Sequence, residues 1–97
     1  MKKEVKSQKR RIENNSIDVV LDVRTDLEYN LGHYPGALHI PTSKLAFEFP
    51  REVSDKEANI LVYCNTGQRS RKAAETLHAM GYKNTRYIAG PYWSLTR

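Results

Sequence analysis

The sequence predicts an α/β domain with a mainly parallel sheet of four or five strands flanked by helices. Three features support this fold class. Short apolar runs rich in β-branched residues recur along the chain, amphipathic segments lie between these runs, and turn residues separate the runs from the amphipathic segments. The chain has 97 residues, 39% hydrophobic and 28% charged, which suits one compact domain and leaves no room for a second core. We expect residues 1–15 to form a basic amino-terminal arm or weak helix, and residues 16–97 to form the single domain.

The first strand and the first helix follow each other directly. Residues 17–23 read IDVVLDV, a run dense enough in β-branched side chains for a strand that is buried on both faces. Thr25 and Glu28 then have the spacing of a capping box, in which each residue satisfies a backbone N–H group of the other. The spacing predicts a short helix that ends near Gly32.

The middle of the chain carries weaker signals. Residues 33–36 are typical of a turn, and residues 37–40 predict a short strand. Residues 43–49 should form a helix that Pro50 stops, because proline lacks the amide hydrogen that a helix interior needs. Residues 52–58 should form a second short helical piece.

The last third of the chain has the clearest elements. Residues 60–63 read ILVY and predict a buried strand, which leads directly into the loop CNTGQRS at residues 64–70. Residues 71–80 should form a helix that Gly81 ends in a left-handed conformation, and residues 85–88 should form one more strand. One face of the predicted helix is apolar, formed by Ala73, Ala74, Leu77 and Met80.

Cys64 is the only cysteine, which excludes an internal disulfide and any zinc motif that needs paired cysteines. It is the first residue after the best central strand, where open α/β sheets bind ligands. The loop after it leads into a helix amino terminus, whose free N–H groups and dipole stabilise a thiolate. Gly67 allows the loop to curl so that its amides point inward, and Arg69 adds positive charge. The pattern predicts a nucleophilic cysteine rather than a small buried core residue.

The charge distribution supports an anionic ligand near this cysteine. Residues 64–97 hold six Lys or Arg and one Glu, whereas residues 15–63 hold four Lys or Arg and eight Asp or Glu. The basic residues do not alternate with aromatic ones as in nucleic-acid readers, so we expect no nucleic-acid partner. Because no apolar run approaches the roughly 20 residues that span a bilayer, and no signal-peptide pattern follows the basic start, we expect a cytoplasmic protein with no membrane partner.

Several motifs resemble the rhodanese family of sulfurtransferases, especially its small single-domain bacterial members of the phage-shock type. They are the strand ILVY with the loop CNTGQRS, then LDVR at residues 21–24, Glu28 with Tyr29, and GHYPGALHIP at residues 32–41. The resemblance runs from about Val19 to Gly90. It implies a three-layer rhodanese-like domain and a thiosulfate sulfurtransferase that needs no metal and no organic cofactor.

The implied reaction moves a sulfane sulfur from a small anionic donor such as thiosulfate to cyanide, a thiol or a protein acceptor. It passes through a persulfide on Cys64, with loop amides acting on the developing charge as an oxyanion hole does. Arg69 would orient the donor, while Asp22 and Arg24 would form a buried pair that braces the site. The substrate-binding residues implied by the resemblance are Asn65, Thr66, Gly67, Gln68, Arg69 and Ser70, with Thr66 and Gln68 tuning the choice of donor or acceptor.

Two alternatives remain open. Phosphatases and arsenate reductases of this fold place an arginine six positions after the cysteine, but here that position is Ser70 and Arg69 lies five positions on. The shorter loop suits one sulfur atom better than a tetrahedral phosphate. A non-catalytic binding module of the same fold is the second alternative, although such modules typically lose the cysteine that this chain keeps.

Other residues are less informative. His33, His39 and His78 do not share the spacing of metal ligands, and we expect His33 to make a structural hydrogen bond. The family's usual glycine pair and final helix are replaced by AGPYW at residues 89–93, with the sequence ending at Arg97. One side of the sheet should therefore be thinly covered, which favours a homodimer or a larger partner.

Overall fold

The computed structural model describes residues 16–95, which form a four-stranded sheet flanked by helices. All strand pairs are parallel, in the order β2-β1-β3-β4. This confirms the predicted α/β class with a parallel sheet. The strands are β1 (Val19–Asp22), β2 (Leu38–His39), β3 (Ile60–Tyr63) and β4 (Thr85–Tyr87). The predicted arm at residues 1–15 lies outside the described part of the chain.

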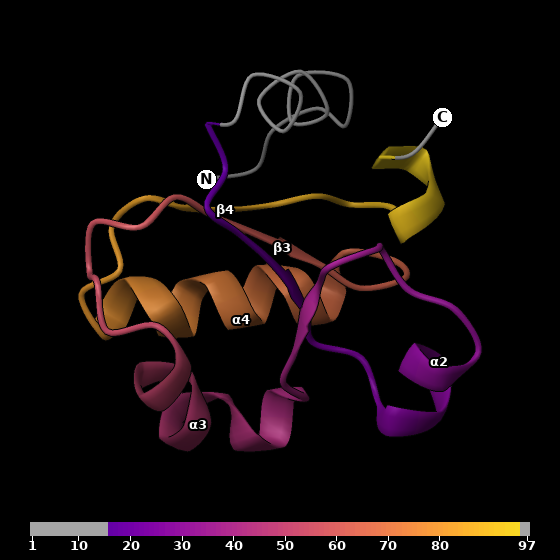
Figure 1. Ribbon diagram of the computed structural model, residues 1–97, viewed down its shortest axis with the longest axis horizontal. Coiled ribbons are helices and arrows are strands. Elements are labelled where there is room, and N and C mark those ends of the chain that lie inside the picture. The colour runs from indigo at the N-terminus through magenta and orange to yellow at the C-terminus, as the bar shows by residue number, and fades with distance from the viewer. Residues whose placement is uncertain (1–15, 96–97) are drawn as a thin grey trace.

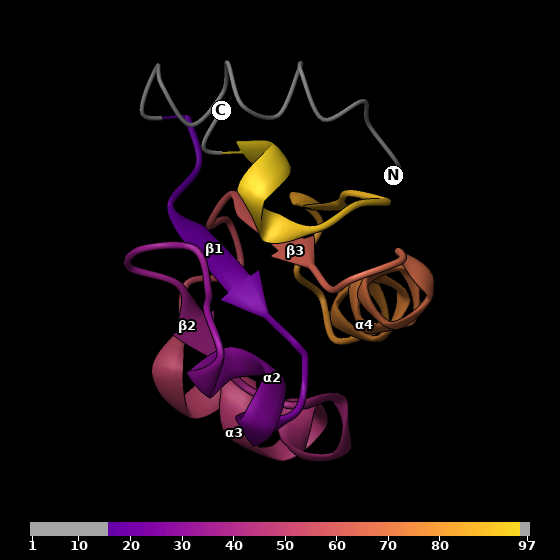
Figure 2. The ribbon, with the colours of Figure 1, turned by 90° about the vertical axis from the view of Figure 1, so that its right-hand side faces the viewer.

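Within residues 16–95, helices cover the two faces of the sheet unequally (Figure 1). The helices α3 and α4 lie along one face, and the short helix η2 lies on the other, as the rotated view also shows (Figure 2). The helical elements are α2 (Asp26–Asn30), η1 (Thr42–Lys44), α3 (Leu45–Glu52), α4 (Gln68–Ala79) and η2 (Tyr92–Leu95). None of the helices within residues 16–95 has the length and apolar character needed to cross a lipid bilayer.

The central strand β3 separates two hydrophobic clusters. Ile60 and Val62 point into the larger cluster beside α3 and α4, whereas Leu61 and Tyr63 point into the smaller one on the opposite face. All four side chains are fully buried. Because successive residues of a strand face opposite sides, a strand covered on both sides needs an unbroken apolar run, and this is what residues 60–63 supply.

Local signals in the first half of the domain are mostly confirmed. The Thr25 hydroxyl accepts from the Glu28 N–H at 3.3 Å, and the Glu28 carboxylate accepts from the Thr25 N–H at 3.0 Å. This is the predicted capping box, and it starts α2. The strand expected over residues 17–23 is shorter, because only β1 pairs with its neighbours.

Two predictions about the middle of the chain are wrong. The helix α3 begins later than expected and includes Pro50 rather than stopping before it, because the Val53 N–H still bonds to the Phe49 carbonyl and closes the last turn. The helical piece expected over residues 52–58 is a turn. Asp55 accepts there from the Glu57 N–H through its side chain, a local bond that competes with helix formation.

The helix after the cysteine loop is longer at its start than the sequence predicts. α4 begins at Gln68, three residues before the expected position, and its buried face includes Ala73, Ala74 and Leu77. Gly81 follows with φ of 101°, which confirms the left-handed conformation that the sequence predicts at the end of this helix. The early start places the loop residues Gln68 and Arg69 in the first turn of the helix.

Candidate active site

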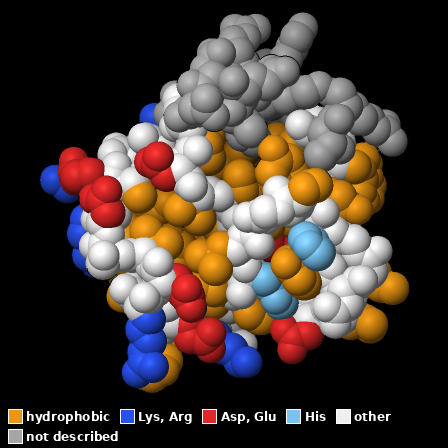
Figure 3. All heavy atoms as spheres, in the orientation of Figure 1, with side chains coloured by type: hydrophobic (Ala, Val, Ile, Leu, Met, Phe, Trp, Pro, Cys, Tyr) orange, Lys and Arg blue, Asp and Glu red, His pale blue; other side chains and the backbone are white. Residues whose placement is uncertain are grey.

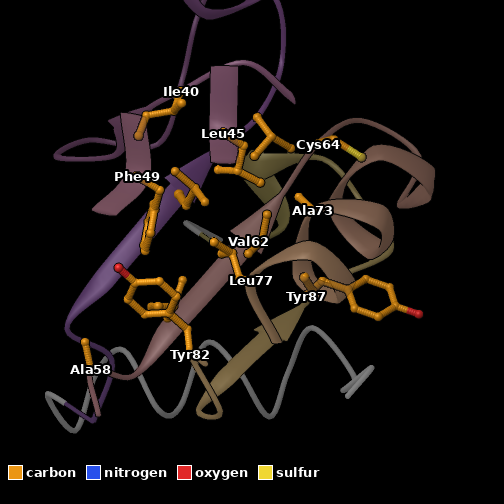
Figure 4. Packing of buried hydrophobic residues seen from close by; sticks show 14 residues of the cluster. Ile40, Leu45, Phe49, Ala58, Val62, Cys64, Ala73, Leu77, Tyr82 and Tyr87 are labelled. Atoms are coloured by element: carbon orange, nitrogen blue, oxygen red, sulfur yellow. The ribbon is translucent and has the colours of Figure 1, made fainter. Parts of the chain in front are cut away.

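Cys64 directly follows β3, at the edge where the parallel strands end. Its side chain is fully buried. In the close view of the larger cluster, the sulfur lies at the margin of the packed side chains, next to the loop that leads into α4 (Figure 4). The fold therefore holds a single thiol between the hydrophobic core and the beginning of a helix.

Backbone amides of the loop and helix converge on the sulfur. The Gly67 N–H donates to Sγ at 3.1 Å and the Ser70 N–H donates at 3.3 Å, while the Ser70 hydroxyl lies 3.5 Å away. Burial alone would raise the pKa of the Cys64 thiol, but the hydrogen bonds from Ser70, Gly67 and Thr66 outweigh it and the pKa lies below its ordinary value. Donors aimed at one sulfur stabilise its thiolate form.

Gly67 is required by the shape of this loop. It adopts φ of 97°, which side chains disfavour, and it is the residue that caps the start of α4. A Cβ atom at this position would lie only 2.8 Å from the Cα atom of Ala89. The loop therefore passes so close to the segment after β4 that only glycine fits.

Ser70 is placed inside the protein and contacts the sulfur. Its side chain is fully buried, and its hydroxyl lies 3.0 Å from the Ile88 carbonyl and 3.1 Å from the Gly67 carbonyl. One hydroxyl hydrogen can serve the carbonyls while the thiol is protonated, and can turn to Sγ when the thiolate forms. The resemblance implies that Ser70 binds substrate, and in the structure its hydroxyl and its N–H group both contact the cysteine sulfur.

Arg69 forms an ion pair with Glu28, a residue that the sequence did not assign to the site. Its two terminal nitrogens donate to the two carboxylate oxygens of Glu28, at 2.7 and 2.9 Å. The Asn65 side-chain amide also donates to Glu28, at 2.8 Å. The bond from Arg69 is the main cause that lowers the pKa of the Glu28 carboxyl to about 2. The same bond raises the pKa of Arg69.

Glu28 was missed because the sequence explains it fully as the end of a capping box. It performs that role and also ties α2 to the cysteine loop across a separation of 41 residues. The motif that pairs Glu28 with Tyr29 was the only available signal, and it carried no indication of a partner. When a carboxylate makes both a local and a distant contact, sequence spacing reveals only the local one.

Asp22 and Arg24 form the buried pair that the resemblance implies. The Arg24 side chain donates to Asp22 through two nitrogens, the shorter contact being 2.8 Å. The Tyr63 hydroxyl donates to the same carboxylate at 2.6 Å, and Arg24 also donates to the Gly32 carbonyl at 2.6 Å. This network fixes the ends of β1 and β3 on either side of the site.

Two open pockets flank the cysteine loop. One, of about 240 Å³, is lined by Arg24, Glu28, Leu31, Gly32, Asn65, Tyr92 and Trp93. The other, of about 170 Å³, is lined by Thr66, Gly67, Gln68, Arg71, Tyr87 and Ala89. The exposed side chains of Thr66 and Gln68 therefore face a different pocket from the Glu28 carboxylate.

The histidines have structural partners. His33 and His39 contact the backbone carbonyls of Tyr29 and Arg24 through one ring nitrogen each, at 2.9 and 2.8 Å. Both rings stack on Tyr29, and two histidine side chains with hydrophobic atoms between them are visible on the surface in Figure 3. The hydrogen bond expected for His33 is confirmed. Within residues 16–95, no group of side chains has a composition suited to a metal ion.

Comparison with known proteins identifies a family for this chain. The model of the rhodanese-like domain matches residues 4–94. A solved structure described as "rhodanese with anions from E. coli" is 34% identical, with 75% of this chain and 86% of that chain covered and a TM-score of 0.71. A human single-domain sulfurtransferase is 24% identical, with 98% of this chain and 94% of that chain covered and a TM-score of 0.81, which shows a shared fold.

Longer relatives also match. The tRNA uridine(34) hydroxylase of Erwinia tasmaniensis is 36% identical over 76 residues, which cover 74% of this chain and 22% of that protein. The corresponding hydroxylase of Yersinia pestis is 34% identical over 74 residues, which cover 72% of this chain and 21% of that protein. The chain thus spans about a fifth of the length of these curated relatives. Since the family model covers nearly all of the described fold, this chain belongs to the rhodanese-like domain family.

Proposed function

We propose that this protein is a sulfurtransferase that carries a sulfane sulfur on Cys64. The observation that carries the proposal is the set of N–H donors from Gly67 and Ser70 on the sulfur, which favours a thiolate in a chain of the rhodanese-like family. A thiolate at a helix amino terminus is a strong nucleophile at neutral pH. The reaction needs no metal or organic cofactor, because a thiolate and its hydrogen-bond donors can perform both steps.

The first half-reaction loads the enzyme. The Cys64 thiolate attacks the outer sulfur of a donor such as thiosulfate, forming a new S–S bond. The S–S bond of the donor breaks, and its electron pair leaves with sulfite. The product is a Cys64 persulfide anion, whose terminal sulfur would be stabilised by N–H groups of the loop at residues 65–70, as in an oxyanion hole.

The second half-reaction returns the enzyme to its starting state. Cyanide or a thiolate acceptor attacks the terminal sulfur of the persulfide, and the electron pair of the S–S bond returns to Cys64. With cyanide the product is thiocyanate. The Ser70 hydroxyl, 3.5 Å from Sγ, is placed to donate to the thiolate that this step regenerates.

The phosphatase alternative is less well supported by the site. Phosphatases of this fold use an arginine six positions after the cysteine to hold phosphate, whereas the residue at that position here is the buried Ser70. Arg69 is held by the Glu28 carboxylate, which would repel a phosphate group approaching it. The hydroxylase activity of the longer relatives is not transferred to this chain, which matches about a fifth of their length.

Steady-state turnover tests the proposal. The wild-type protein should produce thiocyanate from thiosulfate and cyanide, or from another sulfane donor and cyanide, and Cys64→Ser should produce none while keeping a native circular dichroism spectrum. Hydrolysis of an aryl phosphate is measured in parallel. Thiocyanate production that survives in Cys64→Ser, or phosphate release that exceeds thiocyanate production, would contradict the proposal.

A further inference from the structure

Positive charge near the cysteine is already compensated by neighbouring carboxylates. Arg24 is paired with Asp22 in the protein interior, and Arg69 is paired with Glu28 through two hydrogen bonds. The sequence predicted that Arg69 would attract an anionic donor. In the folded chain, its positive charge is offset before any donor arrives.

Glu28 keeps its charge under ordinary conditions. Its carboxylate accepts from Arg69, Asn65 and the backbone of Thr25, and the bond from Arg69 holds the pKa of the carboxyl at about 2. A donor that approaches Arg69 therefore meets a fixed negative charge beside it. Repulsion from that charge scales with the charge of the donor, so it penalises a dianion about twice as much as a monoanion.

The pocket beside this ion pair offers an apolar wall. Glu28 and Asn65 line one part of it, and Leu31, Tyr92 and Trp93 contribute hydrophobic surface. Leu31 is 80% exposed and Trp93 is 46% exposed, so this surface is open to a ligand. Asn65, which lines this pocket, is covalently adjacent to Cys64. Thiosulfate has no group that could use such a wall.

We propose that the site selects a singly charged sulfane donor that carries an apolar group over doubly charged thiosulfate, and that Glu28 is the residue that determines this selection. The inference rests on the proposed sulfurtransferase function. Organic thiosulfonates have the required chemistry: the Cys64 thiolate attacks the terminal sulfur of R–SO2–S⁻, the S–S bond forms, and R–SO2⁻ leaves with the electron pair of the broken bond. Organic persulfides share the single charge and the apolar substituent.

The charge selection is tested with two small donors that differ by one charge, thiosulfate and methanethiosulfonate. The ratio of their kcat/KM values is measured in the wild-type protein and in Glu28→Gln. Glutamine can retain the capping box but leaves Arg69 without its counter-charge. The substitution should shift the ratio about tenfold in favour of thiosulfate. Because a general loss of loop order lowers both rates, the ratio isolates the effect of charge.

Matched variants complete the charge test. Glu57→Gln removes an equal charge from an exposed residue before the start of β3, at the opposite edge of the sheet from Cys64, and should leave the ratio unchanged. Arg69→Gln leaves the Glu28 carboxylate without its partner and should shift the ratio against thiosulfate. Shifts of the ratio in opposite directions in Glu28→Gln and Arg69→Gln support the assignment of Glu28. Ratios equal to that of the wild-type protein in all variants overturn it.

The apolar wall is tested separately by comparing benzenethiosulfonate with methanethiosulfonate. Trp93→Ala should reduce the preference for the aromatic donor about threefold to tenfold, because the ring loses a contact surface. Phe47→Ala removes another exposed aromatic side chain that does not line the pocket, and should leave the preference unchanged. An unchanged preference in Trp93→Ala would overturn the pocket assignment.

Failure of the inference and failure of the proposed function give different results. If none of the three donors places a sulfur atom on Cys64, the sulfurtransferase function itself is wrong. If the persulfide forms from all three donors and Glu28→Gln does not alter their ratio, the function stands and the inference about Glu28 is wrong.

Discussion

The Ser70 hydroxyl is the side-chain group that most directly favours the thiolate of Cys64. It lies 3.5 Å from Sγ and makes the largest of the contributions that lower the pKa of the thiol. In Ser70→Ala we expect the pKa to rise and the rate of alkylation by iodoacetamide at neutral pH to fall about tenfold, since a hydrogen bond to a charged group is lost. The rate is measured as a function of pH, and the profile should move to higher pH.

A matched serine variant tests whether this effect is specific to Ser70. Ser43→Ala changes an exposed residue in η1 and should leave the alkylation profile of Cys64 unchanged. If Ser70→Ala and wild type have the same profile, the backbone N–H groups of Gly67 and Ser70 alone account for the reactivity of the thiol.

Gly67 and Gly36 offer a comparison between two left-handed glycines. Their φ angles are 97° and 83°, but an added Cβ would meet the Ala89 backbone at Gly67 and nothing within 4 Å at Gly36. We expect Gly36→Ala to lower the free energy of unfolding by about 1 kcal/mol, the cost of the backbone conformation. Gly67→Ala should lower it by about 3 kcal/mol or more, because the loop must also move. Urea unfolding measures both, and equal losses would contradict the close approach.

The sequence predicts the cysteine and its loop well but not the contacts that surround them. Cys64 and Gly67 are recognised because a strand, a glycine-containing loop and a helix follow one another in sequence. The Glu28 contact with Arg69 depends on how α2 lies against the start of α4, a tertiary arrangement that no local spacing encodes. The sequence therefore predicts Arg69 as a residue that orients the donor, but it does not predict the ion pair with Glu28.

Tyr63 connects three segments through one hydroxyl group. Its oxygen donates to Asp22 at 2.6 Å and accepts from the Tyr34 N–H at 3.0 Å, so β3, β1 and the turn before β2 meet there. Burial is the main cause that raises the pKa of Tyr63, so it stays protonated as a donor. Tyr63→Phe should lower the free energy of unfolding by about 1 to 3 kcal/mol, because the buried Asp22 carboxylate and the half-buried Tyr34 N–H group each lose a partner.

Tyr87→Phe is the control for this prediction. The hydroxyl of Tyr87 points away from the packed cluster (Figure 4), so its removal should change stability by less than about 0.5 kcal/mol. Thermal and urea unfolding of both variants provide the comparison. A loss in Tyr63→Phe no greater than that in Tyr87→Phe would mean that the hydroxyl does not hold these segments together.

The tether between α2 and α4 should make stability depend on pH in the acid range. The pKa of Glu28 is about 2 in the folded chain, below the ordinary value of 4.5. A lowered folded pKa means that the contribution is fully present above pH 4.5 and is lost as the pH falls towards 2. Because both side chains are partly exposed, we expect only about 1 kcal/mol.

Glu28→Gln provides the measurement. Its free energy of unfolding should lie below that of wild type at pH 6, and the difference should shrink between pH 4.5 and pH 2. Glu57→Gln, with an exposed carboxylate at the other end of the sheet, should show no such convergence. A constant difference between wild type and Glu28→Gln across this range would contradict the ion pair.

Elements with strong patterns are predicted better than those with weak ones. The buried apolar run of β3 and the capping box of α2 are each determined by residues close together in sequence, and both are confirmed. The sequence wrongly predicts that Pro50 stops the helix. Pro50 removes only one N–H donor, near the end of α3, and the same helix packs the Phe49 side chain in the core. Tertiary packing outweighs a local breaker in this case.

The parallel pairing of the whole sheet follows from the alternation of strands and helices. The apolar run at residues 60–63 indicates that β3 is a central strand, but the position of β2 at the edge depends on contacts beyond its two residues. The homodimer expected from the sequence stays a prediction, which sedimentation of the full chain tests.

The proposed sulfurtransferase function depends on whether Cys64 becomes a persulfide. The most direct measurement is the intact mass of the protein after incubation with thiosulfate or a thiosulfonate, followed by addition of cyanide. We predict a gain of one sulfur atom in the wild-type protein, no gain in Cys64→Ser, and loss of the added mass with release of thiocyanate. A wild-type mass that stays unchanged with every sulfane donor would contradict the proposed function.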